Sequence, residues 1–304
     1  MTRSKASAAA LLFSATFLCA VSALAQTPAA LTTDPTPDAA NPPSMVSLAG
    51  VPSHGENLLG VFYLAAEAGP HPTLVLMHGF PGYEQNLDLA QAIRRAGWNV
   101  LAVHYRGSWG VKGTFSYAHA IEDAGAEVAF VRDPANIAKY HIDPNKIVLL
   151  GHSMGGFMVA SAAAHDPKVA GVVMISAWNI GGSFPPPEAG AAVIEKAKKG
   201  MAASFIADNN VAPLAGCTAE SLVDEAYAHR TEWNFDTFAP ALASRPFLVI
   251  TANDGLAPAD HAFVVALQKA GDTHVTETHF ATDHSYSGQR IALTTAILNW
   301  LAQF

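Results

Sequence analysis

Short strand-like runs, most of them continuously apolar, alternate along this chain with stretches of helical periodicity. Six such runs lie at residues 73–77, 99–103, 146–150, 169–175, 246–250 and 274–280. Runs of this length fit buried strands better than helices. Continuous apolar strands that are separated by helices indicate a parallel sheet covered on both faces. The sequence therefore predicts an α/β fold with a mostly parallel central sheet.

The intervening segments complete this architecture. Helical patterning is present at residues 87–96 and 118–132, after residue 154 and after residue 289, and residues 45–65 have the glycines and alternation of an antiparallel lead-in. Residues 179–242 contain no convincing strand, but they include three consecutive prolines at 185–187 and helical patterning at 191–199 and 219–229. Because this insertion is too long for a plain loop, we expect a small helical cap.

The first 25 residues have the layout of a secretory signal peptide. Arg3 and Lys5 precede an apolar run at 8–21, and Ala23-Leu24-Ala25 forms a small-residue cleavage site. The apolar run is shorter than a bilayer span of roughly 20 residues, which disfavours a membrane anchor. We therefore expect export to the periplasm or the exterior. Residues 26–44 are rich in Pro, Ala and Thr and predict a disordered linker, which leaves 45–304 as one domain.

Charge and cysteine content narrow the classes of partner. The chain has 17 basic and 25 acidic residues, a formal charge of −8, and loss of Arg3 and Lys5 with the leader brings it near −10. No basic patch is present, which argues against nucleic acid or anionic membrane as a partner. Beyond the leader only Cys217 remains, so the mature chain can form no intramolecular disulfide.

The sharpest chemical motif is Gly151-His152-Ser153-Met154-Gly155, which directly follows the apolar run ending at Leu150. A G-x-S-x-G sequence between a strand and a helix is typical of a nucleophile elbow. The serine occupies a strained backbone conformation there, and glycines on either side make room for the crossing chain. We therefore predict Ser153 as the nucleophile.

A serine hydroxyl needs a base that takes its proton. Of the 13 histidines, His284 lies just after the last expected strand and before the C-terminal helix. His274 and His279 fall within that strand, and His152 is expected to point away from the nucleophile. We therefore predict His284 as the base.

The acid that orients the base should follow the penultimate strand. Asp254 comes directly after the run ending at Ile250, whereas Asp260 lies further along and Asp283 adjoins the base. Asp254 is therefore the predicted acid, and the order Ser, Asp, His is the one expected of this arrangement.

Two backbone amides complete the predicted site. His78-Gly79-Phe80-Pro81-Gly82 follows the first core strand, and the amides of Phe80 and Met154 are the expected donors to an oxyanion. The aromatic residues that we expect to line an acyl pocket are Phe80, Tyr83, Trp109, Trp178 and Phe184.

These motifs together resemble the α/β-hydrolase superfamily. Two further stretches, residues 105–110 (Tyr-Arg-Gly-Ser-Trp-Gly) and 142–146 (Ile-Asp-Pro-Asn-Lys), are similar to the branch that holds prolyl-oligopeptidase-type peptidases, serine aminopeptidases and dienelactone-hydrolase-like esterases. The chain departs from that branch in having Thr251 where a glycine often begins the acid loop. It also has no β-propeller, and its nucleophile is serine where dienelactone hydrolases have cysteine.

The resemblance implies acyl transfer to water through an acyl-enzyme. Hydrolysis of a carboxylic ester of small or medium size is the first hypothesis. A serine exopeptidase acting on short peptides is the second, with its charged group drawn from the acidic residues of the cap, and a non-catalytic binding protein on the same scaffold is the third. We expect no metal and no cofactor, because the histidines lack ligand spacing and no phosphate-binding glycine loop is present. Oligomeric state is left open.

Overall fold

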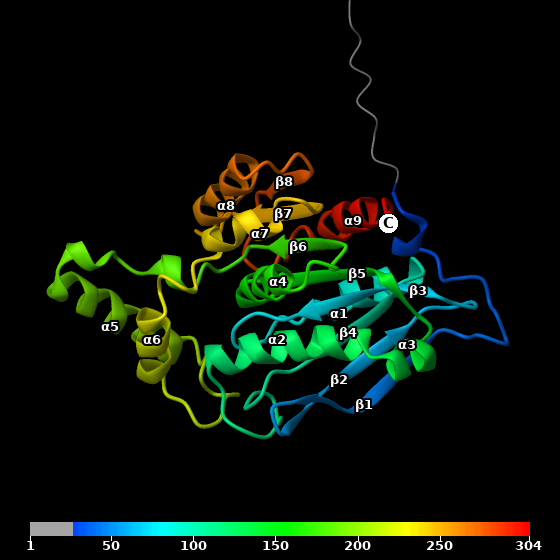
Figure 1. Ribbon diagram of the computed structural model, residues 1–304, viewed down its shortest axis with the longest axis horizontal. Coiled ribbons are helices and arrows are strands. Elements are labelled where there is room, and N and C mark those ends of the chain that lie inside the picture. Colours follow the sequence, from blue (N-terminus) through cyan, green and yellow to red (C-terminus); the bar gives the residue numbers. More distant parts are fainter. Residues whose placement is uncertain (1–26) are drawn as a thin grey trace, which may run out of the picture.

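The computed structural model describes residues 27–304, and its centre is a single eight-stranded sheet (Figure 1). The strands are β1 (Ser44–Ser53), β2 (Glu56–Leu64), β3 (His71–Met77), β4 (Asn99–Val103), β5 (Ile142–His152), β6 (Gly171–Ile175), β7 (Phe247–Ala252) and β8 (Val275–Phe280). They are arranged in the order β1-β2-β4-β3-β5-β6-β7-β8. The pairs β1–β2 and β2–β4 are antiparallel and all other neighbours are parallel. The predicted mostly parallel sheet is confirmed.

Helices cover both faces of this sheet. One face packs against α1 (Leu87–Arg95) and α9 (Arg290–Leu301), and the other against α2 (Tyr117–Arg132), α4 (Met154–His165) and α8 (Ala257–Lys269). Side chains alternate along β3 accordingly: Leu74 and Leu76 face α1 and α9, whereas Val75 and Met77 face α2 and α4. Burial of such side chains contributes about 1.5–3 kcal/mol each, so the two layers fix the register of the sheet.

A short helix, α3 (Pro134–Tyr140), separates α2 from β5 and was not anticipated from the sequence. It begins at Asp133, whose side chain accepts hydrogen bonds from the amides of Ala135 and Asn136 at 2.8 and 3.2 Å. A proline at the first helical position after an aspartate cap is a standard helix start. This helix brings the chain to the beginning of β5.

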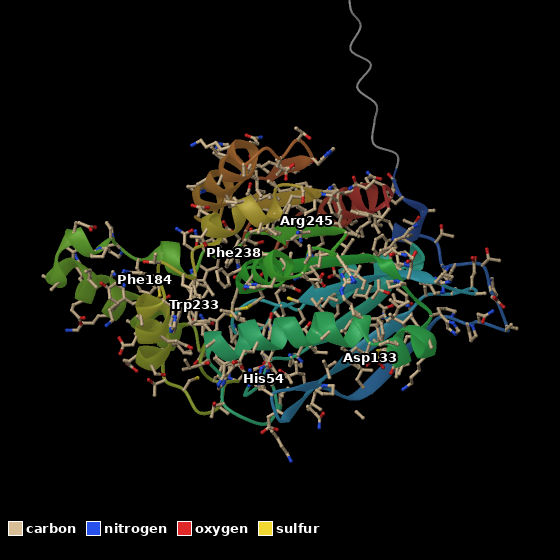
Figure 2. All side chains as sticks on the ribbon, viewed as in Figure 1. His54, Asp133, Phe184, Trp233, Phe238 and Arg245 are labelled. Atoms are coloured by element: carbon tan, nitrogen blue, oxygen red, sulfur yellow. The ribbon has the colours of Figure 1, made fainter. Side chains whose placement is uncertain are left out.

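The insertion between β6 and β7 is helical, as predicted. It consists of η2 (Gly181–Ser183), η3 (Pro187–Ala189), α5 (Ala191–Ala207), α6 (Ala219–Ala228), η4 (Phe235–Phe238) and α7 (Ala239–Leu242). Helices α5 and α6 project from one end of the sheet, at the left of Figure 1, and form the part that we call the cap. By contrast, Phe238 packs on Phe157 of α4 with ring centroids 5.8 Å apart, so the last part of the insertion rejoins the core. Figure 2 labels Phe184 and Trp233 where the cap joins the rest of the molecule.

The loop at residues 209–215 attaches the cap to the β4–α2 connection. The Trp109 amide donates to Pro213 O at 3.0 Å, and the Ala215 amide donates to Gly107 O at 2.8 Å. The Phe115 amide in turn donates to Ala215 O at 2.9 Å. These backbone hydrogen bonds fix one end of the cap beside the carboxyl edge of the sheet.

The predicted signal peptide lies outside the described residues. Within the segment predicted as a linker, η1 (Ala29–Leu31) packs against α1 and α9, and Arg95 Nε donates to Ala30 O at 2.6 Å. Between residues 27 and 304, no helix is both long enough and apolar enough to span a bilayer. The division into leader, linker and domain stays a prediction.

Candidate active site

Ser153 lies at the turn between β5 and α4, with φ 57° and ψ −121°. A side chain is rarely found in this conformation, and it costs on the order of 1–3 kcal/mol unless the surroundings enforce it. The neighbouring glycines show why the turn fits here. A Cβ on Gly151 would lie 1.9 Å from Gly155 O, and one on Gly155 would lie 2.0 Å from Met77 O. The elbow therefore needs glycine at both positions, which agrees with the steric expectation from the sequence.

Two backbone hydrogen bonds hold the elbow against the end of β6. The Ser153 amide donates to Ile175 O at 2.9 Å, and the Trp178 amide donates to Ser153 O at the same distance. The strained residue is thus bonded on both sides of its peptide unit. Its conformation is enforced by the adjacent strand, as a preorganised site requires.

Asp254 and His284 meet at the same edge of the sheet. Asp254 follows β7 and His284 follows β8, and His284 Nδ1 donates to Asp254 Oδ2 at 2.8 Å. The Asp254 side chain is 4% exposed and that of His284 is 40% exposed. This pairing uses Nδ1 and leaves Nε2 as the nitrogen available for proton transfer.

Several donors keep Asp254 ionised. Burial by itself raises the pKa of Asp254, but hydrogen bonds from His284, Ser176 and the Leu256 amide outweigh it and lower the pKa to about 2. The Leu256 amide donates to Asp254 Oδ1 at 3.0 Å. Ser176 Oγ also lies 2.9 Å from the Tyr286 hydroxyl, which donates to Ile250 O at 3.2 Å. A buried polar network therefore supports the carboxylate from behind.

His152 faces the backbone of the predicted base. Its Nε2 donates to His284 O at 2.9 Å, and the two rings stack at a tilt with centroids 4.6 Å apart. Burial, followed by the proximity of His284, lowers the pKa of His152 to about 3, so this imidazole is neutral near pH 7. His152 is thus placed to position the His284 main chain.

The loop after β3 lies directly opposite Ser153. A Cβ added to Gly79 would come within 2.9 Å of Ser153 Cβ, so the loop and the elbow are in close contact. Met154 is the first residue of α4, and its amide has no acceptor within the helix. The amide of Phe80 likewise donates to no group among residues 27–304. Both predicted oxyanion donors are therefore free at this edge of the sheet.

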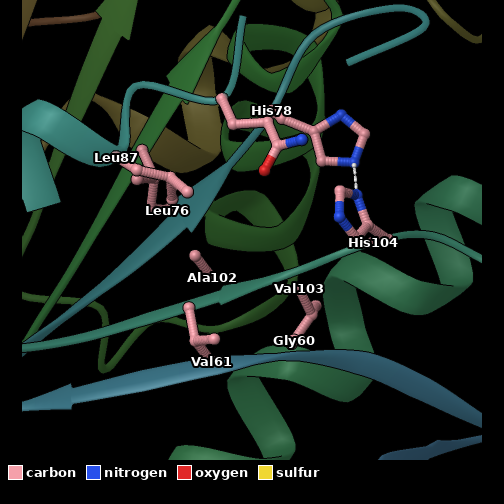
Figure 3. A pocket seen from close by; sticks show the side chains of 9 residues that line it. Gly60, Val61, Leu76, His78, Leu87, Ala102, Val103 and His104 are labelled. Carbon is pink, nitrogen blue, oxygen red and sulfur yellow. Dashed lines mark hydrogen bonds between the residues drawn. The ribbon is translucent and has the colours of Figure 1, made fainter. Parts of the chain in front are cut away.

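A pair of histidines supports the same loop. His78 Nδ1 donates to Gly79 O at 2.8 Å, and His78 Nε2 lies 3.2 Å from His104 Nδ1, beside a cavity of about 100 Å³ lined by β2, β3 and β4 (Figure 3). Burial, together with His104, lowers the pKa of His78 to about 3 despite its hydrogen bond to Gly79. A neutral His78 that accepts from His104 satisfies both contacts.

A cavity of about 170 Å³ opens where these elements meet. Ser153 and His284 both line it, and Asp254 lies behind His284. The lining residues come from the loop after β3, the elbow, the cap and the loop after β8: Gly79, Phe80, Pro81, Gly82, Tyr83, Glu84, His152, Ser153, Asn210, His284 and Ser285. The structure therefore brings Ser153, His284, Phe80 and Tyr83 to one cavity.

The other aromatic residues expected in the pocket are placed further away. Trp109 packs edge-on against Tyr83 with centroids 5.4 Å apart and donates from Nε1 to Pro81 O at 2.6 Å. Trp178 donates from Nε1 to Ser183 Oγ at 2.7 Å and packs against Phe80 at 6.3 Å. Phe184 packs on Tyr227 within the cap, with centroids 5.6 Å apart. Trp109 and Trp178 thus pack behind residues of the cavity wall, and none of the three aromatic residues lines the cavity.

The rival acids have other neighbours. Asp260 is buried and accepts from the Ala177 amide at 3.1 Å, and Asp283 accepts from the Ser287 amide at 2.7 Å. His279 lies 2.9 Å from Thr251 Oγ1. In the described part of the chain, no three His, Cys, Asp or Glu side chains are grouped as a metal site.

Four residues of this region were not predicted from the sequence. Glu84 and Asn210 line the cavity, and Ser176 and Tyr286 support Asp254. Glu84 follows the Pro81-Gly82 turn and could have been noticed as an acid beside the oxyanion loop. Asn210 could not, because nothing in the sequence indicates where the end of α5 comes to rest.

Comparison with known proteins identifies the family and the fold of this chain. Residues 74–292 match the model of the alpha/beta hydrolase family. No curated protein matches the chain. Among solved structures, an esterase of Pyrobaculum calidifontis is similar, with a TM-score of 0.62 and 18% identity over 86% of this chain and 85% of that one.

Two further structures extend the comparison. An esterase of Pyrococcus furiosus has a TM-score of 0.59 and 14% identity over 90% of this chain and 98% of its own. Dipeptidyl peptidase 4 of Porphyromonas gingivalis also has a TM-score of 0.59 and 14% identity, over 86% of this chain but only 35% of its own. At such identities these structures speak for the fold alone. The match to the family model covers most of the sequence, and the chain therefore belongs to the alpha/beta hydrolase family.

Proposed function

We propose that this protein is a serine hydrolase that cleaves carboxylic esters, with Ser153, His284 and Asp254 as its catalytic triad. The observation that carries the proposal is the hydrogen bond between His284 Nδ1 and Asp254 Oδ2. The imidazole of His284 lines the same cavity as Ser153, which lies on its strained elbow. A nucleophile, a base and an orienting acid at one sheet edge are the parts that acyl transfer needs.

The mechanism follows from the placement of these groups. His284 Nε2 takes the Ser153 proton as Oγ attacks the carbonyl carbon, and the ionised Asp254 stabilises the imidazolium that forms. The amides of Phe80 and Met154 donate to the oxyanion, and loss of one such donor typically costs about 3–4 kcal/mol. The alcohol leaves with the proton from His284. Water then gives a proton to His284 and attacks the carbonyl carbon of the acyl-enzyme. His284 returns this proton to Ser153 Oγ as the carboxylic acid leaves.

Small esters are favoured by the size of the cavity, since about 170 Å³ accommodates a short acyl or alcohol group. Two of the similar structures are described as esterases. A serine exopeptidase is the second candidate, because dipeptidyl peptidase 4 shares the fold. The acidic residues of the cap do not line the cavity. This weakens the hypothesis that one of them binds the charged end of a peptide substrate. A purely binding role is disfavoured because Ser153, His284 and Asp254 are the residue types that the proposed triad requires.

We further propose that the enzyme is exported after cleavage near Ala25, as the leader sequence indicates. Analysis of the mature N-terminus by mass spectrometry tests this proposal. A mature chain that begins at residue 26 supports it, whereas a chain that retains Arg3 and Lys5 contradicts it.

Replacement of the nucleophile tests the mechanism. We expect Ser153→Ala to lower kcat for p-nitrophenyl acetate at least about 10³-fold without lowering the melting temperature, because loss of a triad nucleophile removes covalent catalysis. Ser161→Ala is the matched control, since Ser161 is a buried serine of the same helix that does not line the cavity. Equal activity of Ser153→Ala and Ser161→Ala would remove Ser153 from the mechanism.

A further inference from the structure

Glu84 places an uncompensated carboxylate in the wall of the cavity that holds Ser153 and His284. The side chain is partly buried, and its Oε1 accepts from the Asn86 amide at 2.6 Å, which holds the carboxylate in place. Among residues 27–304, Glu84 forms no ion pair and its Oε2 has no hydrogen-bond partner. No lysine or arginine lines the cavity. One carboxylate oxygen is therefore free to pair with a ligand.

The arginine that contacts the neighbouring Asn86 is already engaged. Arg290 forms an ion pair with Asp88 and donates to Asn86 Oδ1 at 3.0 Å and to Ser285 O at 3.1 Å. The guanidinium of Arg290 is thus paired with other groups, and no ion pair joins it to Glu84. The charge of Glu84 is left for whatever enters the cavity.

The end of helix α5 adds negative potential at the same place. This helix runs through Ala207, and Asn210, three residues further on, lines the cavity. The Tyr83 hydroxyl donates to Asn209 O at 2.9 Å, which ties the helix end to the cavity wall. The C-terminal end of a helix has the negative end of its dipole and favours a cation nearby. Glu84 and the end of α5 therefore act in the same direction.

The ring of Tyr83, the residue before Glu84, supplies an aromatic surface to the same cavity. Tyr83 is 56% exposed although it is held at both ends, by Asn209 through its hydroxyl and by Trp109 through its ring. An aromatic face next to a carboxylate is a favourable site for an ammonium group. Its rigidity lowers the entropy lost on binding.

The elbow, which belongs to the same cavity lining, has the reverse polarity. The N-terminus of α4 and the free amides of Met154 and Phe80 favour negative charge there. The cavity thus offers an anion-stabilising side at Ser153 and a cation-stabilising side at Glu84. Building on the proposed function, we propose that the substrates are esters with a positively charged ammonium group a few bonds from the carbonyl, with Glu84 as the counter-ion.

Isosteric pairs of esters test this proposal directly. L-Alanine methyl ester and methyl isobutyrate differ by an ammonium group on the acyl side, and acetylcholine and 3,3-dimethylbutyl acetate differ on the alcohol side. Hydrolysis of all four can be followed by the same pH-stat titration. We expect the wild-type enzyme to have a kcat/KM at least tenfold higher for the cationic member of one pair, and this preference to fall as NaCl is raised from 20 to 500 mM.

Glu84→Gln removes the charge but keeps an oxygen for the Asn86 amide. We expect this variant to lose at least tenfold in kcat/KM for the preferred cationic ester and less than threefold for its neutral isostere. Glu195→Gln is the matched control, because it removes one charge from α5 at a residue that does not line the cavity. A preference unchanged by Glu84→Gln, or equally reduced by Glu195→Gln, contradicts the proposal.

A binding measurement separates this inference from the proposed function. Calorimetric titration with benzyltrimethylammonium should show binding to wild-type and Ser153→Ala protein and at least tenfold weaker binding to Glu84→Gln. The uncharged analogue neopentylbenzene should bind wild type and Glu84→Gln alike. If no ester is hydrolysed but the cation binds in this Glu84-dependent way, the esterase proposal fails and the cation site stands. If esters are hydrolysed but the cation does not bind, the cation site is overturned.

Discussion

The elbow and the cap lie on either side of one cavity, yet they are held in very different ways. At the elbow, backbone atoms approach so closely that Gly151 and Gly155 have no space for a Cβ. In the cap, a Cβ added to Gly200 of α5 would have no atom within 4 Å apart from the backbone of its own helix. The cap is joined to the core by the loop at 209–215 and by aromatic contacts such as Phe205 on Phe80, with centroids 4.8 Å apart.

This difference separates two tasks of the site. In the proposed mechanism, the atoms that exchange a proton have to be held within a fraction of an ångström. The dense backbone contacts at the elbow hold Ser153 in this way. In the proposed function, selection of the substrate depends on the cavity wall, to which the segment after α5 contributes Asn210. We infer that changes in the cap alter which substrate is accepted more readily than they alter the chemistry.

A matched pair of glycine substitutions gives the largest expected difference between the two regions. In Gly155→Ala the new Cβ would lie 2.0 Å from the Met77 carbonyl oxygen, so the elbow must shift. We expect a loss of at least about 3 kcal/mol in the free energy of unfolding, together with loss of ester hydrolysis. Gly200→Ala should instead be neutral or stabilise α5 by up to about 1 kcal/mol, because alanine has the higher helix propensity. Urea unfolding measures both, and similar losses in the two variants would refute the contrast.

Adjacent residues of α5 provide a test within the cap itself. Phe205 is 8% exposed and packs on Phe80 and Trp178, whereas Ile206 is 55% exposed. We expect Phe205→Ala to lower the free energy of unfolding by about 3 kcal/mol and Ile206→Ala by less than about 1 kcal/mol. Phe205→Ala should also raise KM more than it lowers kcat, since its ring supports the substrate side of the oxyanion loop. A large fall in kcat at unchanged KM would show that the cap helps to set the catalytic geometry.

The smallest expected effect depends on pH and concerns the core beside the elbow. Burial, opposed by the Ala177 hydrogen bond and reinforced by Asp254 and Glu277, raises the pKa of Asp260 to about 8. The folded protein therefore holds this proton between about pH 4 and 8 while the unfolded chain has released it, so the stabilising contribution falls as pH rises. Asp260→Asn cannot titrate and should match wild type near pH 4, where the unfolded wild-type chain begins to release this proton. By pH 8 we expect the variant to be about 2 kcal/mol more stable than wild type. This value is smaller than the one that the ideal slope of about 1.4 kcal/mol per pH unit would give.

Chemical unfolding of both proteins at pH 5, 6.5 and 8 measures this divergence. A difference in the free energy of unfolding that stays constant with pH would mean that Asp260 is ionised throughout this range. Such a result would place a second carboxylate charge beside Asp254, and the elbow would then need an additional compensating donor.

Patterns that belong to a single element were readable from the sequence. The central strands followed from their apolar runs, because a strand buried on both faces has few polar residues. The turn at Ser153 followed from the glycines around it, and the structure shows the close approach that excludes other residues. The location of β8 also followed, although β8 begins at Val275 and not at His274.

Features that depend on tertiary packing were not readable. The helical pattern in the cap was expected to end at residue 199, but α5 continues through Gly200 to Ala207 because Ala202 and Phe205 are buried against the core. The acidic residues of the cap were considered for substrate binding, yet Glu225 accepts from the Tyr117 and Ala118 amides at the start of α2. Local sequence does not specify which residue of a distant segment reaches a cavity, and this is why Asn210 was not predicted.

The order of the cavity residues along the chain has a consequence for biosynthesis. The wall begins at Gly79 and ends at Ser285, so its parts leave the ribosome far apart in time. A chain that ends after β6 contains the elbow residues, but it has neither Asp254 nor His284. In the proposed mechanism hydrolysis therefore requires the last two strands, and we expect a polypeptide truncated before them to be inert.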